Sequence, residues 1–412
     1  MHKQIFFISC LLLAFFIPVF PRVLPAIILI MVLNWLVSGI YLTTLPRLIK
    51  GTGQIRLLWF TSLYILYMIG MLYSADYGYG WFDLEVKMSL FIFPVIFATS
   101  DLSDFDASGT RFFSGAYIAG CLAGSLLLFG HAWMANDYRG VPNPYYYTNL
   151  SWYYHSSYLA MYYTFGIGIA LVYLVRDFKH QAFLKTIFLS LVITYLEVLI
   201  FLLSSKAGVI SLVLTELLFL VLLIWSRAGA IRIILFASVA VVLFFSLSWI
   251  FPFALSRMSK ADSVVTSSKA SHSNPEDGTV ARMAIWKVSI GLIRENFMFG
   301  VGTGDVKDAL IESYRQHHLY PILKKKLNAH NQYLQTFIAI GFCGFMLLAL
   351  SLFVPAFWSL KKQNSLYFVF IFIFALNILF ESMLENQAGV VFYAFFNAFL
   401  FSKSVGASTP PA

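Results

Sequence analysis

Long apolar runs separated by short polar segments follow one another along the whole chain. A helix that crosses a bilayer needs about 20 apolar residues, and runs near that length recur throughout the sequence. The pattern predicts an all-α integral membrane protein with about twelve transmembrane helices. The predicted segments cover residues 5–20, 23–45, 57–74, 87–99, 112–134, 156–175, 183–203, 207–225, 233–250, 331–357, 366–381 and 386–401.

The composition narrows the class of protein further. Hydrophobic residues make up 60% of the 412 residues and charged residues 11%, whereas soluble chains carry about 25% charged residues. These proportions exclude a soluble enzyme, a disordered protein and a secreted disulfide scaffold. The apolar runs are continuous rather than alternating, which excludes a porin-type barrel. The net charge of +9 fits loops that face anionic lipids and an anionic substrate, and we expect no nucleic-acid partner.

The distribution of Lys and Arg among the short loops indicates the orientation. Positive residues concentrate in cytoplasmic loops, and most of them lie on one side if both termini are cytoplasmic. The inner side then holds Lys3, Arg47, Lys50, Arg56, Arg111, Arg176, Lys179, Lys185, Arg227, Arg232, Lys361, Lys362 and Lys403, and the outer side holds Arg22, Lys87, Arg139 and Lys206. The predicted parts are helices one to nine (1–250), a long outer loop (251–330), helices ten to twelve (331–401) and a disordered inner tail (402–412).

The long outer loop contains two predicted helices. One is capped by Asp277 or Thr279, runs to about Glu295 and collects its apolar residues on one face, as in helices that lie on a membrane surface. A glycine-rich turn over 300–305 leads into a second helix that ends near Gln316. The G-x-G pattern in that turn does not follow a β-strand, so it does not indicate a nucleotide site.

Three ionisable residues at the outer ends of apolar segments form a candidate site. Asn328 is expected to cap the tenth helix and to place His330 in its first turn. There the helix dipole favours a neutral imidazole, which can act as a general base. Lys206 lies in the short outer turn before the eighth segment, and Arg282 lies near the start of the amphipathic helix. Two such cations can hold a pyrophosphate. Taken singly, each residue also fits a plainer role: an interfacial histidine, a lysine that reaches toward the headgroups, or an arginine bound to them.

Other outer residues carry weaker signals. The third outer loop is rich in rings: Tyr145, Tyr146, Tyr147, Trp152, Tyr153, Tyr154 and His155. These rings fit an interfacial belt and, as the alternative, a surface on which sugars stack. Glu381 and Glu385 in the last outer turn either face water or pair with the candidate cations. No cluster shows metal-ligand spacing, so we expect neither a metal nor another cofactor.

Five short motifs flank and fill the long outer loop. They are Ser204–Gly208, Ala281–Trp286, Phe299–Gly304, Ala329–Gln335 and Gly341–Gly344. Their order and spacing, with the long loop after a ninth segment, resemble the O-antigen ligase and O-antigen polymerase superfamily. The resemblance covers roughly residues 200–350. Members of that superfamily are integral membrane glycosyltransferases of the GT-C type.

The resemblance implies an O-antigen ligase of the bacterial inner membrane with a periplasmic active site. Such ligases transfer a glycan from undecaprenyl pyrophosphate to the lipid A core, with inversion and without a metal. The partners are then the carrier-linked glycan, the lipid A core and membrane lipids. The catalytic histidine of the family corresponds to His330 and its loop arginine to Arg282, whereas Lys206 replaces its other arginine. Asn331 is expected to hold His330 or a sugar hydroxyl, with Gln335 as a second supporting residue.

Three other functions stay open from the sequence. A polymerase of the same superfamily uses the same donor chemistry to join repeat units on the carrier, and only the single large outer loop favours a ligase. A transferase that acts on protein hydroxyls is a further variant. A transporter of lipid-linked glycans belongs to a different class, and it is expected to show internal repeats and ionisable residues deep within its spans.

Overall fold

The computed structural model describes residues 1–49, 53–140, 143–176, 183–225 and 278–406, and every regular element in these ranges is a helix. This agrees with the all-α prediction. The elements are α1 (His2–Phe16), η1 (Pro21–Val23), α2 (Leu24–Ser38), α3 (Ile40–Ile49), η2 (Gly53–Thr61), α4 (Ser62–Gly70), η3 (Met71–Tyr73), α5 (Tyr77–Lys87), α6 (Ser89–Thr99), α7 (Ala107–Arg139), α8 (Tyr147–Leu150), α9 (Ser156–Arg176), α10 (Phe183–Leu202), α11 (Lys206–Trp225), α15 (Gly278–Glu295), α16 (Val306–Gln316), α17 (Tyr320–Lys325), α18 (Gln332–Lys361), α19 (Ser365–Asn377), η4 (Met383–Glu385) and α20 (Gln387–Gly406).

Seven helical segments in the described ranges are long and apolar enough to cross a membrane. They are Pro21–Ser38, Arg56–Tyr73, Ala107–Asp137, Ser156–Val175, Phe183–Leu202, Lys206–Ile224 and Gln332–Lys361. The helices α1 and α19 are apolar but shorter. The predicted ninth segment, 233–250, lies outside the described residues, so the count of twelve stays a prediction. The helix α20 continues to Gly406, into the stretch predicted as a disordered tail.

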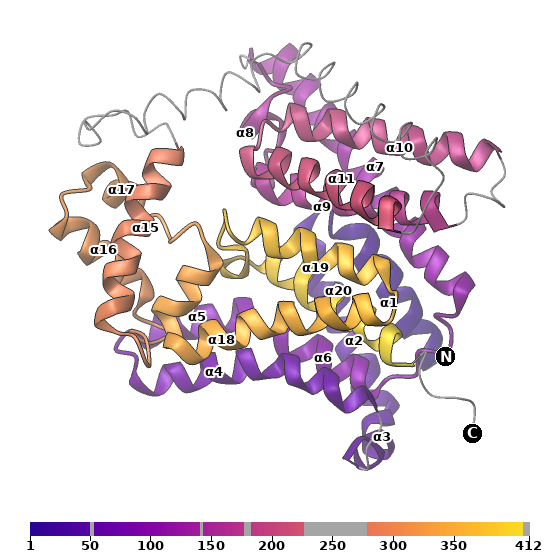
Figure 1. Cartoon of the computed structure of the whole chain (residues 1–412), viewed down its shortest axis with the longest axis horizontal. Coiled ribbons are helices and arrows are strands. Elements are labelled where there is room, and N and C mark those ends of the chain that lie inside the picture. Colours follow the sequence, from indigo (N-terminus) through magenta and orange to yellow (C-terminus); the bar gives the residue numbers. More distant parts are fainter. Residues whose placement is uncertain (50–52, 141–142, 177–182, 226–277, 407–412) are drawn as a thin grey trace.

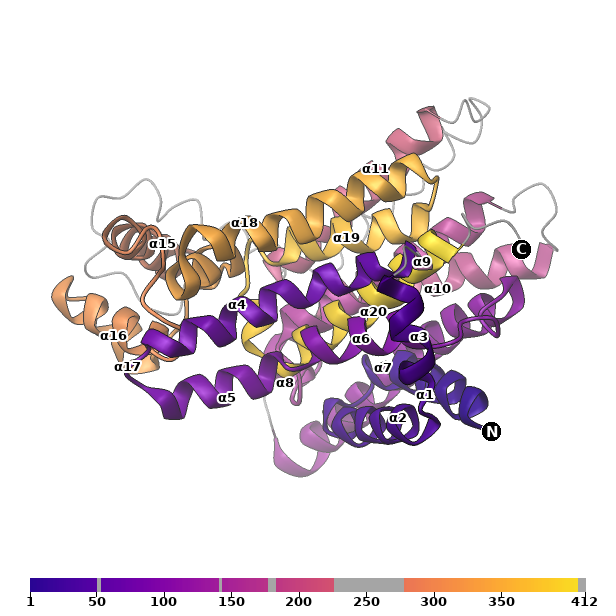
Figure 2. The ribbon, with the colours of Figure 1, turned by 90° about the horizontal axis from the view of Figure 1, so that it is seen from below.

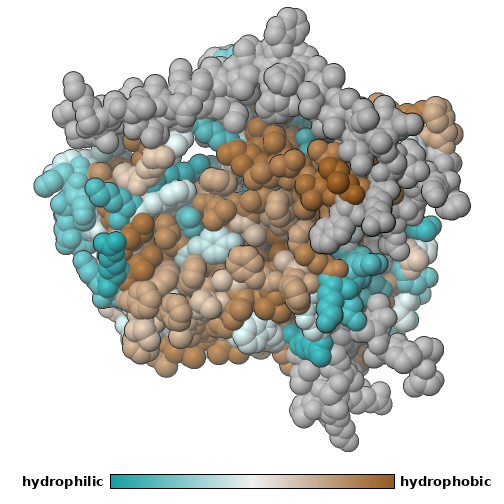
Figure 3. Space-filling model, viewed as in Figure 1, coloured by the Kyte–Doolittle hydropathy of each residue, from teal (hydrophilic) through white to brown (hydrophobic). Residues whose placement is uncertain are grey.

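The hydrophilic surface gathers at two opposite ends of the helix bundle. The helices α15–α17 form one end, and the N-terminus lies toward the other end (Figure 1, Figure 2). Between these ends the space-filling view shows a broad apolar band (Figure 3). An apolar band between two polar ends is the surface expected of a protein that spans a bilayer.

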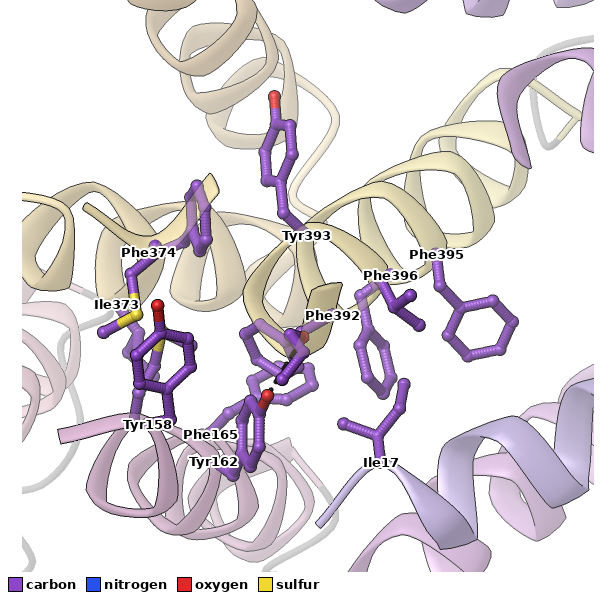
Figure 4. Close-up of a cluster of buried hydrophobic side chains, with 14 of the residues drawn as sticks. Ile17, Tyr158, Tyr162, Phe165, Ile373, Phe374, Phe392, Tyr393, Phe395 and Phe396 are labelled. Atoms are coloured by element: carbon purple, nitrogen blue, oxygen red, sulfur yellow. Dashed lines mark hydrogen bonds between the residues drawn. The ribbon is translucent and has the colours of Figure 1, made fainter. Parts of the chain in front are cut away.

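The helix α9 lies in the middle of the bundle, and most of its apolar stretch is buried. Rings of α9 pack on α20 (Figure 4), and the centroids of Phe165 and Phe396 lie 5.0 Å apart. The hydroxyl of Tyr162 donates to the carbonyl of Ala388 at 3.0 Å, and that of Tyr158 donates to the carbonyl of Ser382 at 3.5 Å. A buried hydroxyl without a partner is costly, so these bonds hold the start of α9 against the segment that follows α19.

The two helices predicted in the long outer loop are present as α15 and α16. Thr279, one predicted cap of the first helix, lies inside α15, and the other, Asp277, lies outside the described residues. Asp305 precedes α16, and its carboxylate accepts the backbone N–H groups of Ala75 and Asp76 at 2.8–3.0 Å. The start of α16 is thereby attached to the start of α5.

The glycine-rich turn over residues 300–305 contacts α18 where that helix is interrupted. Near Gly341, where φ is 65°, the backbone leaves the helical region and frees two carbonyl groups. The N–H of Val301 donates to the carbonyl of Ile338 at 2.8 Å, and that of Gly302 donates to the carbonyl of Ala339 at 3.0 Å. The glycines of this turn therefore permit a close approach of two backbones, which anchors α15 and α16 to α18.

Candidate active site

His330 lies immediately before α18, in a turn that differs from the prediction. The helix begins at Gln332, and its cap is Asn331, whose side-chain oxygen accepts the N–H of Leu334 at 3.1 Å. The predicted cap, Asn328, instead accepts the N–H of His330 at 3.0 Å. The predictions that Asn328 caps the helix and that His330 occupies its first turn are therefore wrong.

The backbone of His330 explains the shift of the cap. Its φ of 46° is left-handed and does not belong to a right-handed helix, whereas the extended backbone of Asn331 suits a cap. A left-handed residue other than glycine costs about 1–3 kcal/mol and persists only where its surroundings hold it. The surroundings fix the preceding residue, Ala329. The carbonyl of Ala329 accepts the indole N–H of Trp286 at 3.0 Å, and the N–H of Ala329 donates to the side chain of Gln335 at 3.0 Å. Strain of this kind clusters at functional sites.

Glu381 holds the ring of His330, the role expected of Asn331. It lies between α19 and η4 and is 5% exposed. Its Oε2 atom lies 2.9 Å from Nδ1 of His330, and its Oε1 atom accepts a hydrogen bond from the guanidinium of Arg282. Asn331 instead caps α18, and its N–H donates to the hydroxyl of Ser382 at 3.2 Å. One carboxylate thus joins two of the three predicted site residues.

The contacts of Glu381 with Arg282 and His330 determine the charge of Glu381 and the tautomer of His330. Burial alone raises the pKa of Glu381, but the hydrogen bond from His330 and the charge of Arg282 outweigh it, so this pKa lies below the ordinary value of 4.5. An ionised carboxylate only accepts hydrogen bonds, and Nδ1 must therefore carry the proton of the bond between them. In the neutral imidazole the lone pair then lies on Nε2, the form that a general base requires.

Lys206 approaches the same place from α11. Its ammonium donates to the hydroxyl of Thr279 at 2.9 Å, and Thr279 lies three residues from Arg282 on one face of α15. The hydroxyl of the preceding residue, Ser205, lies 3.1 Å from the hydroxyl of Ser157. The hydroxyl of Ser157 in turn donates to the carboxylate of Glu381 at 3.4 Å. The three predicted site residues, which come from α11, α15 and the turn before α18, are therefore brought together around Glu381.

A second charged cluster forms around Glu385, a residue of the last outer turn. The ammonium of Lys87 is fully buried and donates to Asp83 at 2.5 Å and to Glu385 at 3.0 Å. It also lies 4.8 Å from the ring centre of Tyr67, and Gln332 donates to Glu385 at 3.1 Å. The sequence places Lys87 among the loop cations of the outer side, but the structure buries it, because two carboxylates and a ring take the place of water.

Replacing Glu381 with glutamine removes the charge with little change of shape. The pKa of Glu381 is lower in the native state than in the unfolded state, so its ionisation stabilises the fold at pH values above the ordinary pKa of 4.5. This contribution is lost as the pH falls through the native pKa. We therefore expect the wild type to melt at a higher temperature than Glu381→Gln at neutral pH, and the difference to shrink in acid. Thermal unfolding in detergent across pH measures it, with the exposed Glu312→Gln as control. A difference that does not change with pH contradicts this interpretation.

The sequence region that contains Lys206, Arg282 and His330 matches a known protein family. Residues 189–349 match the profile of a family described as O-antigen ligase. This match supports the O-antigen ligase and polymerase superfamily for that region of the chain. No curated protein matches the chain. Members of the superfamily are membrane glycosyltransferase-like enzymes. The several apolar helices indicate that the present chain is a multi-pass membrane protein.

The region matched by the O-antigen ligase family contains the three candidate site residues but not Glu381, whose carboxylate contacts two of them. Lys206, Arg282 and His330 lie within residues 189–349, and the resemblance over roughly 200–350 is thereby confirmed. Glu381 lies beyond this region. In the sequence, Glu381 is marked only as a carboxylate in the outer turn between the last two apolar segments. That position does not decide whether the carboxylate faces water or a cation.

Proposed function

We propose that this protein is an O-antigen ligase that transfers a glycan from undecaprenyl pyrophosphate to a hydroxyl of the lipid A core oligosaccharide. The convergence of Arg282, Glu381 and His330 beside Lys206 carries the proposal. The superfamily supports a lipid-linked glycan as donor. The reaction takes place at the periplasmic face of the bacterial inner membrane, with both termini in the cytoplasm, and the fold is of the GT-C type.

His330 is the general base of the proposed reaction. Its Nε2 atom takes the proton of the acceptor hydroxyl while the hydroxyl oxygen attacks the anomeric carbon of the donor sugar. Glu381 holds the tautomer and the orientation of the ring, and its negative charge stabilises the imidazolium that forms. The proton later leaves to solvent, which restores the neutral histidine.

Arg282 and Lys206 bind the leaving pyrophosphate. The bond between the anomeric carbon and the phosphate oxygen breaks as the new glycosidic bond forms on the opposite face, which inverts the configuration. The departing lipid pyrophosphate takes the electron pair, and nearby cations stabilise that charge. A guanidinium has five N–H donors, so Arg282 can hold Glu381 and a phosphate oxygen at once. Lys206 acts as a point charge in place of a second arginine.

Cells that lack this gene test the proposal. We expect long-chain lipopolysaccharide to disappear from gels and full-length glycan to accumulate on the carrier lipid, because synthesis of the glycan continues without transfer to the core. The wild-type gene should restore both. A core that carries a single repeat unit would identify a polymerase instead, and an unchanged profile would contradict both assignments.

A second measurement separates the enzyme from a transporter. Purified protein in detergent has no membrane gradient, and a ligase is still expected to consume lipid-linked glycan and to extend the lipid A core. Binding without consumption would favour transport.

A further inference from the structure

His155 is a second histidine beside the candidate active site, and the proposed reaction does not use it. It immediately precedes α9 and is exposed, and its Nδ1 atom accepts the N–H of Ser157 at 3.4 Å. A neutral imidazole has one hydrogen, so an accepting Nδ1 leaves that hydrogen on Nε2. The hydroxyl of Ser157 donates to Glu381 at 3.4 Å. His155 therefore offers an oriented N–H donor at the edge of the site.

The surroundings of His155 favour its neutral form. Desolvation lowers the pKa of this imidazole below the ordinary value of 6.5, and the positive charge of Arg282 adds to the effect, against the opposing charge of Glu381. In the proposed reaction the pyrophosphate is held by Arg282 and Lys206. A neutral donor next to them is suited to an uncharged oxygen, such as a sugar hydroxyl.

Trp152 presents an aromatic surface in the same loop. Its indole stacks on the ring of His131 from α7, with centroids 4.6 Å apart and an interplanar angle of 21°, and the edge of Tyr153 lies against it at 5.0 Å. These contacts hold the indole in one orientation, yet 48% of Trp152 stays exposed. The face of an aromatic ring is electron-rich and attracts the slightly positive C–H groups of a sugar ring.

Two buried polar atoms near Trp152 and His155 in the chain strengthen the case for a ligand. The hydroxyls of Tyr153 and Ser156 are buried and have no hydrogen-bond partner among the described residues. Buried polar atoms are nearly always bonded, and exceptions commonly mark a place for water or a ligand. Both residues lie between, or next to, Trp152 and His155 in the chain.

We propose that Trp152 and His155 form a saccharide subsite beside the active site, in which a sugar ring stacks on Trp152 and a sugar hydroxyl accepts the Nε2–H of His155. This inference rests on the proposed function, since the sugar belongs either to the donor glycan or to the acceptor core. The two sources offer the same hydroxyl and C–H chemistry, and their binding can be measured separately.

Equilibrium binding tests the subsite independently of turnover. The purified protein in nanodiscs is titrated with undecaprenyl-pyrophosphate-linked glycan in one arm and with core lipopolysaccharide in the other. We expect Trp152→Ala and His155→Ala each to raise the Kd for one of these ligands about 3- to 10-fold, the effect of one lost ring contact or hydrogen bond. His155→Gln keeps an N–H donor and should bind more tightly than His155→Ala.

Two exposed residues provide matched controls. Trp133 lies on the same helix as His131 and is 57% exposed, and His318 is exposed beyond α16. Trp133→Ala and His318→Ala should leave both Kd values unchanged, because neither residue belongs to the subsite. An effect of Trp133→Ala equal to that of Trp152→Ala would overturn the proposal and make Trp152 an interfacial anchor.

The two arms assign the ligand and separate the hypotheses. A raised Kd for the lipid-linked glycan assigns the subsite to the donor sugar, and a raised Kd for core lipopolysaccharide assigns it to the acceptor. Unchanged values in both arms would overturn the subsite. If the wild type binds through Trp152 and His155 but transfers no glycan, the proposed function fails and the subsite stands.

Discussion

Replacing His330 with alanine is expected to lower the rate of glycan transfer about 10²- to 10⁴-fold, the range typical of a lost general base. The acceptor hydroxyl then has no group to take its proton, while Arg282 and Lys206 still hold the pyrophosphate. The loss should therefore appear in kcat, with little change in the KM for the donor. Steady-state transfer by the purified protein, with donor and acceptor varied separately, measures both constants.

The partner of the histidine sharpens this test. Because Glu381 orients the ring of His330, Glu381→Gln should lower kcat less in the His330→Ala background than in the wild type. His317→Ala, which replaces an exposed histidine at the end of α16, is the control and should transfer glycan at the normal rate. Normal transfer by His330→Ala, or an additive double variant, would show that His330 is not the base.

Replacing Lys87 with methionine is expected to destabilise the folded protein by about 3–5 kcal/mol, the cost of removing one partner from a buried ion pair. The ammonium is fully buried between Asp83 and Glu385, so both carboxylates would lose their cation at once. Methionine fills a similar volume, and the loss would therefore report charge rather than packing. Thermal and denaturant unfolding in detergent measure it.

Lys3 provides a matched control, because it also contacts two carboxylates, Asp101 and Asp104, but at the surface. Exposed ion pairs contribute little, so Lys3→Met should shift the melting temperature far less than Lys87→Met. Neutralising the partners by Asp83→Asn and Glu385→Gln should restore part of the stability lost in Lys87→Met. Equal shifts for Lys3→Met and Lys87→Met would contradict the role assigned to the buried cluster.

The sequence by itself determined the all-α membrane class of the protein and named the candidate residues of its site. Apolar runs predict helices because each run must satisfy its own backbone hydrogen bonds in a membrane. The helices α15 and α16 belong to the predicted outer loop, and the local residue pattern of each segment predicts them as well. The motifs around Lys206, Arg282 and His330 led to the superfamily that the family match supports.

Only the tertiary structure decided how these residues meet. Asn328 and Asn331 are equally good caps by residue type, and the left-handed backbone of His330, held by contacts with distant segments, selects Asn331. The bond between His330 and Glu381 joins residues 51 positions apart, and that between Lys206 and Thr279 joins residues 73 positions apart. Hydropathy and short motifs describe one segment at a time. A buried charge, by contrast, depends on the partner that another helix brings to it.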